Sequence, residues 1–242
     1  MVMPLYDDNP FTQPIKPVVT WWLIALNLGI FLYETGASQL ALERMIDVFS
    51  LTPAALVGDM SARGWVPAVV TLVTYQFFHA DIGHFFGNML FLWVFGDDIE
   101  RALGRLRFLA FYLLCGVVGG LVFVAYAPQS QIELIGASGA IAGIVVAYVM
   151  LRPCAKITVL TFGIIPMRIS AYWVVGVFAL LQFVNLESAA KSDVAYWCHI
   201  GGMVAGGTLF PLLRPAGVML FECIRGPKVP AVAASADPAG GA

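Results

Sequence analysis

One serine and three histidines are the residues of this chain whose types fit a catalytic site. Ser138 lies in the run Gly-Ala-Ser-Gly-Ala at residues 136–140, at the head of an apolar stretch that continues to Leu151. A serine hydroxyl is a poor nucleophile until a neighbouring base accepts its proton. The candidate bases are the three histidines of the chain, His79, His84 and His199. The elements that carry these side chains must therefore bring one imidazole to Ser138.

The composition indicates a membrane protein. Hydrophobic residues make up 60% of the chain and charged residues only 12%, with a mean hydropathy of +0.85. Soluble domains contain roughly 25% charged residues. The formal net charge of −2 gives no electrostatic reason to expect binding to nucleic acid. The 242 residues are largely used by apolar runs and their connections, which predicts one membrane domain.

Six apolar stretches are predicted to span the membrane, at residues 18–33, 82–95, 108–126, 135–151, 169–186 and 197–213. Several are shorter than the ~20 residues that a bilayer core requires. This pattern predicts short helices buried among longer neighbours, or a locally thin membrane. The expected fold class is an all-α membrane protein, a bundle of six transmembrane helices with a long first outer loop.

The connections complete the predicted domain organisation. Residues 1–17 are predicted to form a short cytoplasmic tail, 18–213 the six-span domain and 214–242 a second cytoplasmic tail that is disordered. Residues 34–70 form the long outer loop, and its amphipathic part at 43–49 is expected to lie in the membrane surface. Two further connections are predicted, a charged turn at residues 96–107 and a basic connection with an apolar middle at residues 152–168.

The basic residues predict the orientation of the chain. With both termini in the cytoplasm, ten of the 13 Lys and Arg residues lie on the inner side. The three on the outer side are Arg44, Arg63 and Lys191. This asymmetry agrees with the excess of basic residues in cytoplasmic loops. We therefore expect a multi-pass protein of the inner cell membrane with both ends in the cytoplasm.

This topology places three polar side chains at one depth. The second, fourth and sixth spans run from outside to inside, and His84, Ser138 and His199 each lie near the outer end of one of them. Asn88 follows His84 at i+4 and so points the same way. Small residues below Ser138 and His199 allow the two helices to approach closely in lipid. The pattern predicts that the Ser138 hydroxyl and the His199 imidazole come within hydrogen-bond reach.

Each of these features also has a structural interpretation. Gly-Ala-Ser-Gly-Ala alone is typical of a helix-packing seam. It is not the G-x-S-x-G elbow of soluble hydrolases, because Gly139 follows the serine directly. His199 alone, or His84 with Asn88, would also serve to bond a neighbouring helix. Their convergence at one depth favours a functional site, since intramembrane polar residues are costly and usually functional.

The spacing of the four cysteines matches no known redox or metal-binding motif. They are scattered at Cys115, Cys154, Cys198 and Cys223, without a CxxC pair or metal-ligand spacing. We expect free thiols that behave as small hydrophobic side chains. Cys198 points about 100° away from the adjacent His199 on a helix and is expected to pack. No metal and no cofactor are predicted.

Together these segments resemble the rhomboid family of intramembrane serine proteases, over roughly residues 7–214. The matching motifs are His79-x4-His84-x3-Asn88, Gly96-x3-Glu100-x3-Gly104, Gly136-Ala137-Ser138-Gly139 and His199-x2-Gly202-x3-Gly206. The motifs are individually short, and their order and placement on six spans make the match specific. The opening Asp-Asp-Asn-Pro at residues 7–10 and the paired tryptophans of the first span also resemble the bacterial branch.

The resemblance implies a Ser-His dyad without a third acid. Ser138 would attack the scissile carbonyl, and His199 would act as general base and then as general acid. His84, Asn88 and the backbone N–H of Ser138 would hold the oxyanion. Structural roles are implied for four of the motif glycines, for His79 and for Glu100, which with Arg101 anchors the loop after the second span. Those glycines are Gly136, Gly139, Gly202 and Gly206.

One position departs from the family pattern. Many members carry an aromatic residue four positions after the serine, where it packs against the catalytic imidazole. Ala142 occupies that position here. The ring of His199 must therefore be supported by another group.

The function implied is a serine endopeptidase that cuts transmembrane segments near the outer face. Its partners would be transmembrane protein substrates within the lipid bilayer, with small residues and weak helix propensity at the cut. One alternative is a rhomboid-like pseudoprotease that binds transmembrane helices without cleaving them, although such proteins usually lack the serine or the histidine. The other is a transporter or channel, which would need polar residues through to the cytoplasmic side, where the fourth and sixth spans are apolar.

Overall fold

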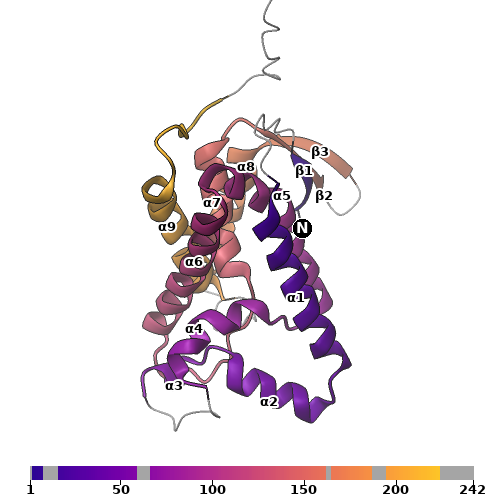
Figure 1. The fold of residues 1–242 in the computed structure, drawn as a ribbon, viewed down its shortest axis with the longest axis vertical. Helices are drawn as coiled ribbons and strands as arrows, with labels where there is room; N and C mark the ends of the chain where they lie inside the picture. The colour runs from indigo at the N-terminus through magenta and orange to yellow at the C-terminus, as the bar shows by residue number, and fades with distance from the viewer. Residues whose placement is uncertain (1, 8–15, 59–65, 162–164, 187–194, 224–242) are drawn as a thin grey trace, which may run out of the picture.

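The computed structural model describes residues 2–7, 16–58, 66–161, 165–186 and 195–223 (Figure 1). Most of this part of the chain is helical, which fits the predicted all-α membrane bundle. The helices are α1 (Val18–Gly36), α2 (Gln39–Phe49), α3 (Pro53–Leu56), α4 (Thr71–Thr74), α5 (Ile82–Leu103), α6 (Arg105–Tyr126), α7 (Ser138–Leu151), α8 (Ala171–Val184) and α9 (Tyr196–Leu213). Two 3₁₀ turns, η1 (Ala68–Val70) and η2 (Tyr75–Phe77), flank α4.

Helix α7 lies at the centre of the bundle, in contact with α5, α6, α8 and α9. Its packing against α9 depends on glycines that leave no room for a side chain. A methyl group built on Gly202 would lie 1.9 Å from the carbonyl oxygen of Gly139, and one on Gly206 would lie 2.3 Å from that of Gly143. The two backbones are therefore in direct contact, as small-residue seams in lipid allow.

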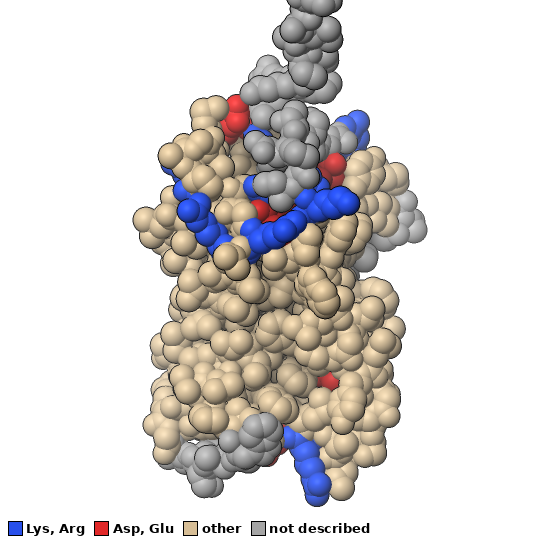
Figure 2. Space-filling model, viewed as in Figure 1, with Lys and Arg blue, Asp and Glu red and all other residues tan. Residues whose placement is uncertain are grey.

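The distribution of charge fits a protein that crosses a membrane. On the face in Figure 2, charged side chains gather at the end that bears the small sheet, and a broad belt without charge separates it from a few charges at the opposite end. By length and composition, α1 and α6 are long and apolar enough to span a bilayer, and α7, α8 and residues 68–77 form shorter apolar helices. The count of six spans stays a prediction.

A three-stranded antiparallel sheet joins residues that the sequence analysis assigned to a tail and to a loop. It has the order β1-β2-β3, with β1 at Val2–Asp7, β2 at Lys156–Thr161 and β3 at Ile165–Ser170. In Figure 1 the strands cap one end of the bundle, opposite α2, α3 and α4. Ile157 and Val159 of β2 pack into the main hydrophobic core, which explains the apolar middle of this basic segment. The chain is therefore not purely α-helical.

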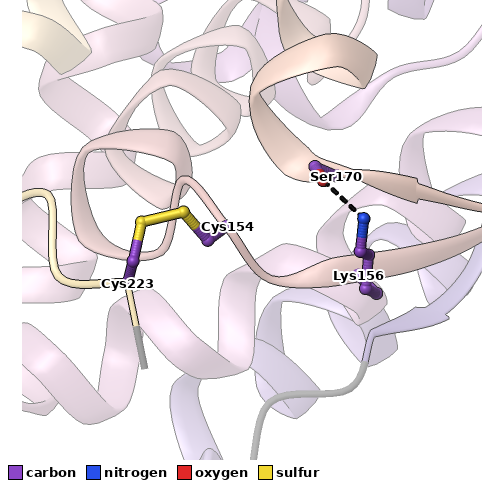
Figure 3. The surroundings of a disulfide bond; sticks show 4 residues. All are labelled: Cys154, Lys156, Ser170 and Cys223. Carbon is purple, nitrogen blue, oxygen red and sulfur yellow. Dashed lines mark hydrogen bonds between the residues drawn. A yellow bond between two sulfur atoms is a disulfide. The ribbon is translucent and has the colours of Figure 1, made fainter. Parts of the chain in front are cut away.

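The prediction of four free thiols is wrong for two of them. Cys154 and Cys223 form a disulfide, although 69 residues separate them in the sequence (Figure 3). Arg152 and Glu222 form an ion pair beside it, at 3.2 Å between Nη1 and Oε2. The first residues after α9, predicted as a disordered tail, are thus bonded to the turn that follows α7, and residues 224–242 lie outside the described residues. Cys115 and Cys198 are buried free thiols, as expected.

Helix α5 continues through most of the segment predicted as a charged turn. It ends at Leu103, and Gly104 makes the turn with a positive φ of 80°, a conformation that favours glycine. Two of the charged residues fit the helix because they lie one turn apart: Arg101 Nη2 lies 3.4 Å from Asp97 Oδ2. The prediction of a charged turn was wrong for residues 96–103 and also for residues 105–107, since α6 begins at Arg105.

Glu100 holds the start of α1. Its buried carboxylate accepts hydrogen bonds from the backbone N–H groups of Val19, at 2.9 Å, and Thr20, at 2.7 Å, and from the Thr20 hydroxyl, at 2.8 Å. The first N–H groups of a helix have no partner within it, and the helix dipole favours negative charge there. The anchor implied for the loop after the second span is therefore, in the structure, a cap on the first helix.

We expect Glu100→Ala to destabilise the protein by about 3 kcal/mol, because three donors, two of them on the buried Thr20, lose their charged acceptor. Thermal unfolding of the purified protein in micelles measures the change. Glu43→Ala is the control, since Glu43 lies on α2 and its carboxylate accepts an exposed hydrogen bond from Gln39. Equal thermal midpoints for the two variants would contradict the role of Glu100 as a cap.

Candidate active site

Ser138 is the first residue of α7, at the end of the helix that lies away from the sheet. The chain reaches it through Gly136, whose φ of 127° is a left-handed conformation that favours glycine. The N–H of Gly136 donates to the carbonyl of Tyr75 at 2.9 Å. Leu134 pairs with Leu51 of the connection between α2 and α3. The predicted outer loop therefore holds the segment that carries the serine, a contact that the sequence did not indicate.

The structure brings Ser138 and His199 together. Ser138 Oγ lies 2.8 Å from Nε2 of His199, which is buried on the first turn of α9. The direct backbone contact at Gly202 lets α9 approach α7 closely enough for this bond. Cys198 turns away and packs against Tyr75, with 3.4 Å between its sulfur and the phenol oxygen. The thiol is thus a packing residue, as its angle on the helix predicted.

A residue that the sequence analysis missed lies on the other side of the imidazole. Nδ1 of His199 lies 2.8 Å from Oε1 of Gln182, a buried side chain of α8. The ring centroids of Phe178 and Tyr196 lie 6.4 and 6.5 Å from that of the imidazole. These three side chains support the His199 ring in place of the aromatic residue that Ala142 replaces. The available signal was a single amide within the otherwise apolar run 171–184.

His84 and Asn88 share one face of α5. The His84 ring lies against Gly136, where a methyl group would stand 2.7 Å from its Cε1 and Nε2 atoms and 3.7 Å from Ser138 Oγ. Asn88 is buried, and its Nδ2 donor has no hydrogen-bond partner within the described residues. Asp81 caps the helix by accepting the His84 N–H at 2.9 Å, and this bond lowers the pKa of the exposed Asp81 carboxyl.

His79 packs against His84, and its backbone contacts a carboxylate whose role was not predicted from the sequence. Its ring meets that of His84 edge-on, with centroids 5.2 Å apart, and stands perpendicular to Phe85. The backbone N–H of His79 is 3.4 Å from both carboxylate oxygens of Glu34, which is buried near the end of α1. A lone carboxylate at the end of an apolar span was the available signal.

The arrangement contains the parts of a nucleophilic site. A hydroxyl faces an imidazole nitrogen, and the N–H groups at the start of α7 have no partner in their own helix. The His84 ring borders the same region. Asn88 lies one turn further along α5, and its buried amide donor has no hydrogen-bond partner within the described residues. Among the described residues, no group of three or more His, Cys, Asp or Glu side chains is placed to hold a metal ion.

Comparison with known proteins gives the family. The Rhomboid domain model matches residues 67–216. The chain is 30% identical over 195 residues to Rhomboid protease GluP of Bacillus subtilis, covering 79% of this chain and 34% of GluP. It is 27% identical over 228 residues to Rhomboid protease AarA of Providencia stuartii, covering 84% of this chain and 77% of AarA.

A third relative is the mitochondrial RHOMBOID-like protein 12 of Arabidopsis thaliana, 29% identical over 161 residues, or 60% of this chain. The match covers 46% of that protein, so this chain spans less than half of its length. The domain match covers more than half of this chain and includes Ser138, His199, His84 and Asn88. The chain is a membrane protein and belongs to the rhomboid family.

Proposed function

We propose that this protein is an intramembrane serine endopeptidase that cleaves transmembrane segments of other membrane proteins. The observation that carries the proposal is the 2.8 Å contact between Ser138 Oγ and His199 Nε2 in a chain of the rhomboid family. A buried imidazole bonded to a serine hydroxyl is the arrangement that activates a weak nucleophile. Relatives whose names include the word protease support the same reaction.

In the proposed mechanism, His199 accepts the Ser138 proton at Nε2 while the oxygen attacks the scissile carbonyl carbon. The resulting oxyanion accepts hydrogen bonds from the Ser138 N–H and Asn88 Nδ2, with the His84 ring beside them. The imidazolium then gives the proton to the leaving amine, which leaves an acyl-enzyme. Water attacks the ester carbonyl, again with His199 as base, and frees Ser138.

We further propose that the site opens near the outer face of the inner membrane, with both termini in the cytoplasm. Two observations support this orientation. Ser138 begins α7 at the end away from the sheet, and charged side chains gather at the sheet end on the face in Figure 2. A shallow site gives water access that the bilayer core denies. Suitable substrates are transmembrane segments with small residues and low helix propensity near the cut.

The test is labelling of the purified protein in micelles by a fluorophosphonate, followed by cleavage of a panel of single-span substrates with mass spectrometry of the products. We expect one labelled residue, Ser138, and discrete cuts that Ser138→Ala removes. Cleavage that survives Ser138→Ala would refute the proposal. Substrate binding without labelling or cleavage would instead support a pseudoprotease that binds transmembrane helices.

A further inference from the structure

Proton transfer from Ser138 requires one tautomer of His199. Nε2 faces the hydroxyl at 2.8 Å, so it must carry the lone pair and Nδ1 must carry the proton. A buried N–H without an acceptor is costly, and the ring would then favour the opposite tautomer or another rotamer. The site therefore needs an acceptor at Nδ1. A carboxylate fills this position in serine proteases with a triad.

The Gln182 side chain is oriented to be that acceptor. Its Nε2 donates to the backbone carbonyl of Phe178 at 3.1 Å, one turn back on α8. A carbonyl only accepts, so the amide nitrogen must face Phe178 and the amide oxygen must face the imidazole. Oε1 lies 2.8 Å from His199 Nδ1, and both side chains are buried.

We propose that Gln182 is a positioning residue that fixes the tautomer and orientation of His199, so that the site functions as a hydrogen-bonded Ser138–His199–Gln182 triad. This inference rests on the proposed function and adds a third member to the dyad implied by the family resemblance. A neutral amide orients the ring without taking a proton. It also gives His199 the support that Ala142 cannot provide.

The test compares two substitutions of similar size at Gln182. Gln182→Met keeps the length of the side chain and removes the acceptor, whereas Gln182→Glu keeps an acceptor and places a carboxylate in a buried position. We expect Gln182→Met to lower kcat and the rate of fluorophosphonate labelling by about 10- to 100-fold, with KM nearly unchanged. Gln182→Glu should retain more activity than Gln182→Met.

A purely structural role predicts the opposite order, because a packing position tolerates Met better than a buried charge. Asn185→Leu is the matched control. Asn185 directly follows α8, and its Nδ2 also donates one turn back, to the Leu181 carbonyl at 2.7 Å, but this hydrogen bond is exposed. That variant should label at the wild-type rate. A Gln182→Met protein that labels like wild type, or a Gln182→Glu protein slower than Gln182→Met, overturns the inference.

A direct measurement covers the case in which a variant does not fold. Nitrogen-15 NMR of wild-type protein labelled at histidine has only three side chains to resolve. We expect the neutral Nδ1–H tautomer at His199, and a dominant Nε2–H tautomer overturns the inference. Failure of wild-type Ser138 to react with the fluorophosphonate would instead remove the proposed function, so the two failures are distinguishable.

Discussion

Gly202→Ala should prevent α9 from packing on α7 and should abolish labelling of Ser138. The added methyl group would lie 1.9 Å from the Gly139 carbonyl oxygen and 2.8 Å from its carbon, and backbone atoms cannot move aside as a flexible side chain can. Separating the two helices would also break the hydrogen bond between Ser138 and His199. Because the clash is with backbone, we expect the upper end of the usual cost of overpacking, about 3 kcal/mol, or roughly 6–12 °C in thermal midpoint for a chain of this size.

The matched control for this prediction is Gly207→Ala on the same helix. A methyl group at Gly207 would make an ordinary contact, 3.7 Å from Val146 Cγ1. Alanine is the better helix former by about 1 kcal/mol, so this variant should be as stable as wild type or more stable. Thermal unfolding in micelles and fluorophosphonate labelling are the two measurements. Similar behaviour of the two variants would disprove direct backbone contact at Gly202.

His199→Asn should lower kcat by at least about 10³-fold, because asparagine cannot accept the Ser138 proton. The thermal midpoint should change far less than in Gly202→Ala, since a polar side chain still faces Gln182. Cleavage of a single-span substrate and the rate of fluorophosphonate labelling measure the loss.

A double variant provides the control for this second prediction. Residues that act as one catalytic unit are strongly non-additive. Adding His199→Asn to Ser138→Ala should therefore cause no further loss of activity. If the two losses multiply instead, Ser138 and His199 act in separate steps and the dyad is refuted.

The contact between Ser138 and His199 could be predicted from the sequence, because it depends on the direction of each span and on the spacing of residues along a helix. Counting residues from the outer ends of three spans placed Ser138, His199 and His84 at one depth. The i+4 spacing put Asn88 on the His84 face. Both inferences need only the direction of each span and the geometry of a helix.

Gln182 and Glu34 could not be assigned in the same way. Gln182 is the single amide in an apolar run and Glu34 comes directly after the first predicted span, and the partner of each lies on a different part of the chain. Whether Gln182 faces lipid, another helix or His199 depends on how α8 is rotated against α9, which hydropathy does not reveal. Their contacts with His199 and with the His79 backbone therefore emerge only from tertiary packing.

The small sheet and the disulfide escaped prediction for a related reason. β1 is a short strand whose partner lies beyond seven helices in the sequence, so no hairpin signal marks it. Pro4 also falls at the irregularity in its pairing with β2, since the register shifts between Pro4 and Tyr6. Cys154 and Cys223 likewise lie far apart in the sequence, and no cysteine motif indicates that they pair.

The pairing of β1 with β2 imposes an order on the biosynthesis of the protein. β1 is translated before α1, but its hydrogen-bond partners on β2 appear only after α1 through α7 have been translated. Tyr148, which donates a hydrogen bond to Asp7, is synthesised 141 residues after it. β1 therefore remains an unpaired strand until β2 has been translated. The sheet that caps this end of the bundle can therefore form only after α7, the helix that carries Ser138, has been translated.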